Sequence, residues 1–121
     1  MNESRGAQRC SCQCHWDLSW LRFGPGKISP SDVDGLFVVE RNGHFLYLET
    51  KRPDEILSDG QKILLLKLSY VPRFTVLLIR GPHSYPQTVT IIKNGGWAEP
   101  EETDRDKFQL RVDAWYKHVD R

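Results

Sequence analysis

The sequence predicts an α/β domain, in which helices pack on a mixed sheet of four or five strands. Three observations support this fold class. The pair Asn42-Gly43 separates two apolar runs, and a type I′ hairpin turn needs positive φ at both of its central residues. A capped helix between two strands then favours a right-handed parallel crossover. The chain finally ends in an amphipathic helix.

The predicted hairpin joins the apolar runs 36–39 and 45–48. A two-residue turn fixes its register, because a slip by one residue would turn every side chain to the other face. The expected opposed pairs are, on the apolar face, Phe37 with Leu48 and Val39 with Leu46, and on the other face, Leu36 with Glu49 and Asp34 with Lys51. The register therefore predicts that Asp34, Glu49 and Lys51 share one face.

The segment after the hairpin predicts a helix and two more strands. Residues 58–61 form a capping-box pattern that opens a helix, which should continue to about Ser69 and end before Pro72. The near-continuous apolar run 74–79 is typical of a central strand covered on both faces. Residues 88–92 predict a further strand.

The two ends of the chain are expected to differ. The C-terminal helix should bury one stripe, made of Phe108, Val112, Trp115, Tyr116 and Val119. Near the N-terminus, Trp16, Trp20 and Leu21 have helical spacing and predict a short helix over one side of the core. We expect residues 1–15 to be a flexible Cys-rich segment and residues 16–121 to form one domain.

Composition sets broad limits on function. With 121 residues, 39% hydrophobic and 27% charged, the chain is typical of one soluble domain. No apolar run approaches the ~20 residues needed to span a membrane, and no signal peptide is visible, so a cytoplasmic protein without a membrane partner is expected. A net charge of +1 means that DNA binding would need a local patch or a bound metal. The acidic residues 99–104 are expected to form a solvated loop.

Three cysteines lie close together near the N-terminus. Their odd number argues against a disulfide framework and fits a reducing compartment. Together with the next residue they are competent ligands for Zn²⁺, and the candidate set is Cys10, Cys12, Cys14 and His15. Ligands this close in sequence can hardly close one tetrahedron, so reduced thiols or a partial or shared site are favoured over a complete zinc site.

The chemistry-bearing residues of the hairpin suit a divalent cation. Mg²⁺ prefers oxygen ligands, commonly one or two carboxylates with waters and substrate oxygens. Asp34 and Glu49 should lie diagonally across the hairpin, with Cβ atoms about 7 Å apart or less. Lys51 follows Glu49 by two residues, so it shares that face, where an ammonium can orient water or stabilise a pentavalent oxyanion. The alternative is a plain cross-strand ion pair worth ~0.2–1 kcal/mol.

These residues also carry a resemblance. Asp34-Gly35-Leu36 followed by Glu49-Thr50-Lys51-Arg52-Pro53 resembles the Asp…Glu-x-Lys motif of the PD-(D/E)XK nuclease superfamily. The helix with Gln61 directly afterwards is similar to phage-type and VRR-nuclease-type members. The resemblance spans residues 31–81 and implies a restriction-endonuclease-like core of hairpin, crossover helix and parallel strand.

The resemblance also implies roles for individual residues. Asp34 and Glu49 would bind Mg²⁺ or Mn²⁺, the backbone carbonyl of Thr50 would complete the metal shell, and Lys51 would take part in catalysis. Gln61 would be a site residue reaching toward the metal pocket, although capping the helix with Ser58 explains it equally well. Many relatives carry another glutamate on the first helix, a position for which Asp17 is the candidate here, and Asp32 is a rival to Asp34.

We therefore expect a metal-dependent DNA endonuclease, structure-selective and phage-like by resemblance. Cutting both strands needs two sites, so a homodimer is expected. Two alternatives remain open. One is a catalytically silent module of the same fold that binds DNA or protein, and the other is a Cys/His metal-binding protein in which the hairpin charges are structural.

Overall fold

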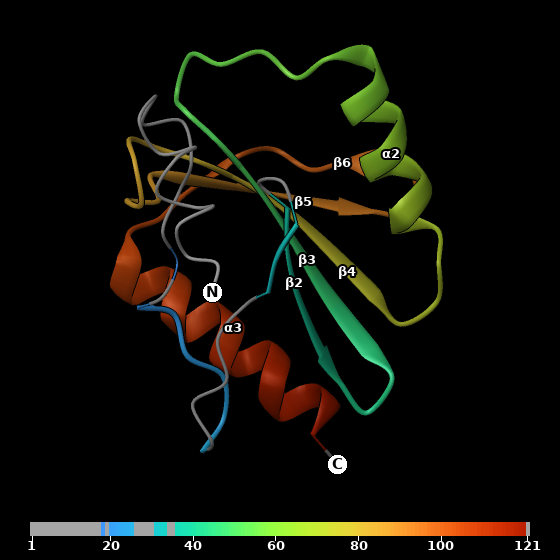
Figure 1. Ribbon diagram of the computed structural model, residues 1–121, viewed down its shortest axis with the longest axis vertical. Helices are drawn as coiled ribbons and strands as arrows, with labels where there is room; N and C mark the ends of the chain where they lie inside the picture. The colour runs from blue at the N-terminus through green and yellow to red at the C-terminus, as the bar shows by residue number, and fades with distance from the viewer. Residues whose placement is uncertain (1–17, 19, 26–30, 34–35, 121) are drawn as a thin grey trace.

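The computed structural model describes residues 18, 20–25, 31–33 and 36–120, which form a mixed sheet and two helices (Figure 1). The elements are β1 (Ser31–Val33), β2 (Leu36–Arg41), β3 (His44–Lys51), α2 (Asp59–Ser69), β4 (Phe74–Arg80), β5 (Thr88–Lys93), β6 (Gly96–Trp97), β7 (Glu101–Glu102) and α3 (Arg105–Val119). The strand order is β1-β2-β3-β4-β5-β6, with β7 paired to β5. This confirms the mixed α and β class, but the sheet has seven strands rather than four or five.

The β2–β3 hairpin has the predicted register. Asn42 and Gly43 have φ of 53° and 79°, as a type I′ turn requires. The antiparallel pairs include Phe37 with Leu48, Val39 with Leu46 and Leu36 with Glu49. The predicted register of the hairpin is therefore confirmed as far as the pair Leu36 and Glu49. Asp34, and with it the expected pairing to Lys51, lies outside the described residues.

Helix α2 forms the predicted connection between β3 and β4. It begins after Ser58, whose Oγ accepts a hydrogen bond from Gln61 N at 3.1 Å, while Gln61 Oε1 accepts one from Ser58 N at 3.0 Å. This reciprocal cap satisfies two backbone N–H groups at the helix start. The helix ends at Ser69, before Pro72. The strand that follows pairs parallel to β3, with Lys51 beside Arg80, which confirms the parallel connection.

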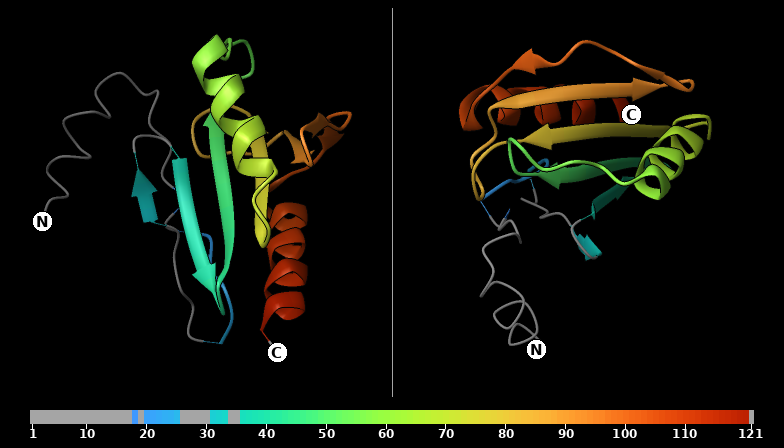
Figure 2. Two further views of the ribbon diagram at one scale, coloured as in Figure 1. Left: turned by 90° about the vertical axis from the view of Figure 1, so that its right-hand side faces the viewer. Right: turned by 90° about the horizontal axis from the view of Figure 1, so that it is seen from above.

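The sheet separates two apolar clusters. Side chains alternate between faces along a strand, so Leu46, Leu48 and Ile79 lie on one face, under Phe108 and Val112 of α3. The opposite face carries the second cluster, which consists of Leu57, Leu65, Val76, Leu78 and Ile92 and includes Leu65, the buried apolar residue of α2. Figure 2 shows α2 and α3 packed against different parts of the sheet. Glu49, Lys51 and Arg80 belong to the α2 face by the same alternation.

In the described part, one sequence prediction is wrong and another is right only in part. Leu18 and residues 20–25 contain no helix, although Leu18 and Leu21 are fully buried and joined by a Leu21 N–H to Leu18 C=O hydrogen bond of 3.0 Å. The helix-like spacing of this segment reflects a single turn that packs on the core. Trp16 lies outside the described residues. The acidic residues of segment 99–104 are exposed, as predicted, but the segment is not a loop throughout. It contains β7, and the Asp104 side chain caps α3 by accepting from Lys107 N at 2.8 Å.

Neither described helix is long and apolar enough to cross a bilayer.

Candidate active site at the end of strand β3

Glu49 and Lys51 lie next to each other on the α2 face of β3. The strand places them two residues apart, and only 7% of Glu49 and 8% of Lys51 is exposed. Lys51 Nζ lies 3.7 Å from Glu49 Oε2, so the predicted proximity of this carboxylate and this ammonium is present. Charged groups are almost never this buried unless they are paired.

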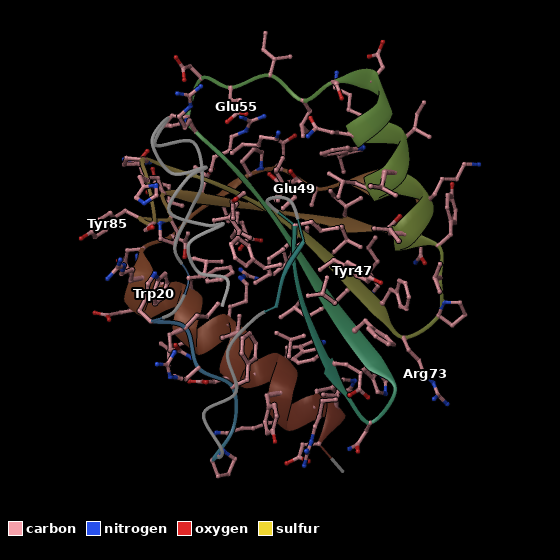
Figure 3. All side chains as sticks on the ribbon, viewed as in Figure 1. Trp20, Tyr47, Glu49, Glu55, Arg73 and Tyr85 are labelled. Atoms are coloured by element: carbon pink, nitrogen blue, oxygen red, sulfur yellow. The ribbon has the colours of Figure 1, made fainter. Side chains whose placement is uncertain are left out.

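A third charged residue, Glu55, joins this pair, and the sequence motif did not predict it. Its Oε2 lies 3.5 Å from Lys51 Nζ, so the ammonium contacts both Glu49 and Glu55. Figure 3 shows Glu55 just beyond the end of β3 that carries Glu49. The exposed side-chain fraction rises from 9% at Lys51 to 29% at Glu55 and 50% at Arg52. The site is therefore covered along the strand and open toward the loop after β3.

Hydrogen bonds between side chains and the main chain hold that loop in place. The backbone N–H of Arg52 donates to Glu55 Oε1 at 3.1 Å. Arg80 Nη1 donates to the carbonyl of Arg52 at 3.2 Å and to the carbonyl of Glu55. A carboxylate shortly after a strand end can accept from the backbone N–H three residues before it, and this was the available sequence signal for Glu55.

The two carboxyl groups have pKa values shifted in opposite directions. Burial raises the pKa of Glu49; Lys51 opposes this, and Glu55 adds to it. Burial also raises the pKa of Glu55, but the N–H of Arg52 and the charge of Lys51 outweigh it, so that pKa lies below its ordinary value. The positive charge of Lys51 thus fails to compensate fully for the burial of Glu49.

These shifts predict how stability depends on pH. The folded state binds the Glu49 proton more tightly than the unfolded state does, so ionisation of Glu49 lowers the unfolding free energy as pH rises from about 4.5 through its raised pKa. Glu49→Gln should remove that decrease. Glu55 acts in the opposite sense: its stabilisation is present above its ordinary pKa and is lost as pH falls through the lowered one.

The measurement is urea unfolding of the parent, Glu49→Gln and Glu55→Gln between about pH 2.5 and pH 8, with the Glu55 effect expected below about pH 4.5. Relative to the parent, Glu49→Gln should gain stability with rising pH and Glu55→Gln should lose it. Difference curves that stay flat for both variants would show that neither carboxyl group is perturbed by folding.

The carboxylates of the described residues fit a hard cation in part. Glu49 and Glu55 supply carboxylate oxygens, and Mg²⁺ commonly uses one or two carboxylates with water. Within residues 18, 20–25, 31–33 and 36–120, no three His, Cys, Asp or Glu side chains are grouped to hold a metal. Asp34, Asp17 and the proposed zinc ligands lie outside this part. Whether they contribute stays a prediction.

Three other predicted residues are placed as follows. Gln61 is engaged in the α2 cap with Ser58, as the capping alternative expects, and its catalytic role stays a prediction. Thr50, which lies between Glu49 and Lys51 in the sequence, is also buried. Arg73, which the sequence predicts by default to be ordinary surface charge and alternatively part of a phosphate-contacting rim with Arg52, Arg80 and Lys62, lies at the opposite end of β4, near the hairpin turn (Figure 3).

The two interpretations of Gln61 can be separated by mutation. Ser58→Ala and Gln61→Ala should each lower the unfolding free energy by about 1 kcal/mol, and the double variant should lose less than their sum because they share one cap. Urea unfolding of the four proteins measures this coupling. A loss of nuclease activity in Gln61→Ala that Ser58→Ala does not share would support the catalytic role instead.

Comparison of the chain with protein-family models, curated proteins and solved structures gave no match. The interpretation of the site therefore depends on its own geometry and charges.

Proposed function

We propose that this protein is a divalent-metal-dependent DNA nuclease with a restriction-endonuclease-like core. The observation that carries the proposal is the position of Glu49 and Lys51, side by side on one face at the end of β3. The hairpin, the crossover helix α2 and the parallel strand β4 surround them in the order that the Asp…Glu-x-Lys motif implies.

The charges of the site favour a cation-binding role over a purely structural ion pair. A structural pair is balanced when each ion neutralises its partner. Here Glu55 is paired with both Lys51 and Arg52, whereas Glu49 has Lys51 alone, and the pKa of Glu49 stays raised despite Lys51. The site can therefore accept additional positive charge, and a second carboxylate from Asp34 would increase that capacity.

The residues divide the work as follows. Glu49, Asp34 and the carbonyl of Thr50 would hold a Mg²⁺ or Mn²⁺ ion, which when bound supplies charge compensation and an acidified water. Lys51 is held beside that position by Glu49 and Glu55, from which its ammonium can donate to a phosphate oxygen. Glu55 is a positioning residue for Lys51. Substrate would enter from the open side, past Arg52.

The test is a cleavage assay on branched, linear duplex and single-stranded DNA. We expect cleavage with Mg²⁺ or Mn²⁺ and none with EDTA, and we expect Glu49→Gln to be inactive. Cutting both strands of a duplex needs two such sites, so the homodimer belongs to this proposal. If no DNA is cut and calorimetry detects no binding of either metal, the proposal is wrong.

A catalytically silent nuclease-fold module is the second candidate. The low exposure of Glu49 and Lys51 favours it, because a reacting phosphodiester must reach both groups. This candidate predicts DNA affinity that does not change with Mg²⁺ and no cleavage by the parent protein. The same assay, run beside a binding titration, separates the two candidates.

A further inference from the structure

A groove of about 480 Å³ lies on the α2 face beside the candidate active site. Leu57 and Leu78 contribute apolar surface to it, and Lys62, Arg80 and Trp97 contribute larger side chains. Leu78 and Arg80 pair with Glu49 and Lys51 in the parallel β3–β4 register. Because neighbouring strands are about 4.8 Å apart, the groove begins one strand away from the proposed catalytic residues.

Two of the groove residues are cations without an acidic partner in the described part of the chain. Arg80 is partly buried and uses Nη1 to donate to two backbone carbonyls, and Lys62 is exposed on the first turns of α2. A guanidinium has five N–H donors in a planar fork that matches phosphate oxygens. Nη1 of Arg80 is bound to the backbone, and the other N–H donors of the guanidinium can bind a phosphate oxygen.

The groove also presents an aromatic surface. Trp97 is 38% exposed. It lies on β6, which the turn at Asn94 and Gly95 folds back so that Trp97 pairs with Ile92. The ring therefore lines the same groove as the two cations. Aromatic side chains in this setting stack on nucleic-acid bases, and this stacking tolerates any base.

We propose that this groove binds an unpaired nucleotide of a nucleic-acid strand. Arg80 and Lys62 contact its phosphates, and its base packs on Trp97. A base inside a duplex is stacked between its neighbours and cannot present its face to Trp97, so the groove selects single-stranded or branched DNA. The inference deepens the proposed nuclease function, because it places the strand next to Glu49 and Lys51.

The experiment measures the affinity of a fluorescein-labelled oligothymidylate of about ten nucleotides by anisotropy, in EDTA so that no cleavage occurs. We expect Trp97→Ala to weaken binding roughly tenfold and Trp97→Phe to stay near the parent. Lys62→Ala should weaken binding and reduce its salt dependence. Lys67→Ala is the matched control, since Lys67 is an exposed lysine of α2 that does not line the groove.

Three outcomes would overturn the inference that the groove binds an unpaired nucleotide. These outcomes are equal affinity for the same sequence as duplex, unchanged affinity in Trp97→Ala, and equal competition by an oligoglutamate peptide, which would indicate a site for acidic peptides. Circular dichroism checks that each variant is folded. Binding that depends on the groove, without cleavage in Mg²⁺, would contradict the proposed nuclease function but agree with the proposed groove. Cleavage that is unchanged in Trp97→Ala would contradict the groove but agree with the nuclease function.

Discussion

Glu49→Gln and Asp34→Asn are each expected to abolish the stabilisation that Mg²⁺ or Mn²⁺ gives to the parent protein. An ion that binds the folded state and not the unfolded state adds about 2.7 kcal/mol at a hundred times its dissociation constant. The buried carboxylate of Glu49 has a raised pKa because Lys51 does not fully offset its burial. A bound cation would remove that deficit, and without Glu49 there is no deficit to remove.

Both variants should keep the stability of the metal-free parent, and Glu49→Gln should exceed it at neutral pH. The reason is that a neutral amide has no charge to bury, whereas the ionised Glu49 costs free energy in the folded state. Thermal unfolding with EDTA and with each metal measures both effects. Glu102→Gln is the control, because Glu102 lies on β7 and is exposed. An undiminished metal response in Glu49→Gln would exclude Glu49 as a ligand.

The parts of the fold with strong local rules could be predicted from the sequence. Asn42-Gly43 accepts positive φ at both turn positions, and from that turn the period of two places Glu49 and Lys51 on one face. The cap between Ser58 and Gln61 similarly marked where α2 begins. Each of these signals lies within a few residues of the structure that it determines.

The parts that depend on tertiary contacts could not be predicted. The strands β6 and β7 have two residues each, too few to show any periodicity. Glu55 joins the site through a backbone N–H and through Lys51, and a turn conformation of this kind leaves little trace in sequence. The turn that joins Leu18 and Leu21 has the residue spacing of a helix because both leucines pack in the same core.

Lys51→Ala is expected to lower the cleavage rate by about 10²–10³-fold, the range for removal of one preorganised transition-state contact. Metal binding should persist, because its ligands are oxygens. Without metal, however, the variant should be less stable than the parent, since Glu49 and Glu55 lose the ammonium that lies 3.7 and 3.5 Å from them. Removing one partner of a buried pair leaves an uncompensated charge.

Metal should therefore stabilise Lys51→Ala by more than it stabilises the parent, because Arg52 still pairs with Glu55 but Glu49 has then lost the cation that lies 3.7 Å from it. Single-turnover cleavage at saturating metal gives the rate, and thermal unfolding gives the metal response. Lys51→Arg keeps the charge with a different donor geometry, so its metal-free stability should be closer to the parent while its cleavage remains slow. Cleavage at the parental rate in Lys51→Ala would reduce Lys51 to a structural counter-ion of Glu49.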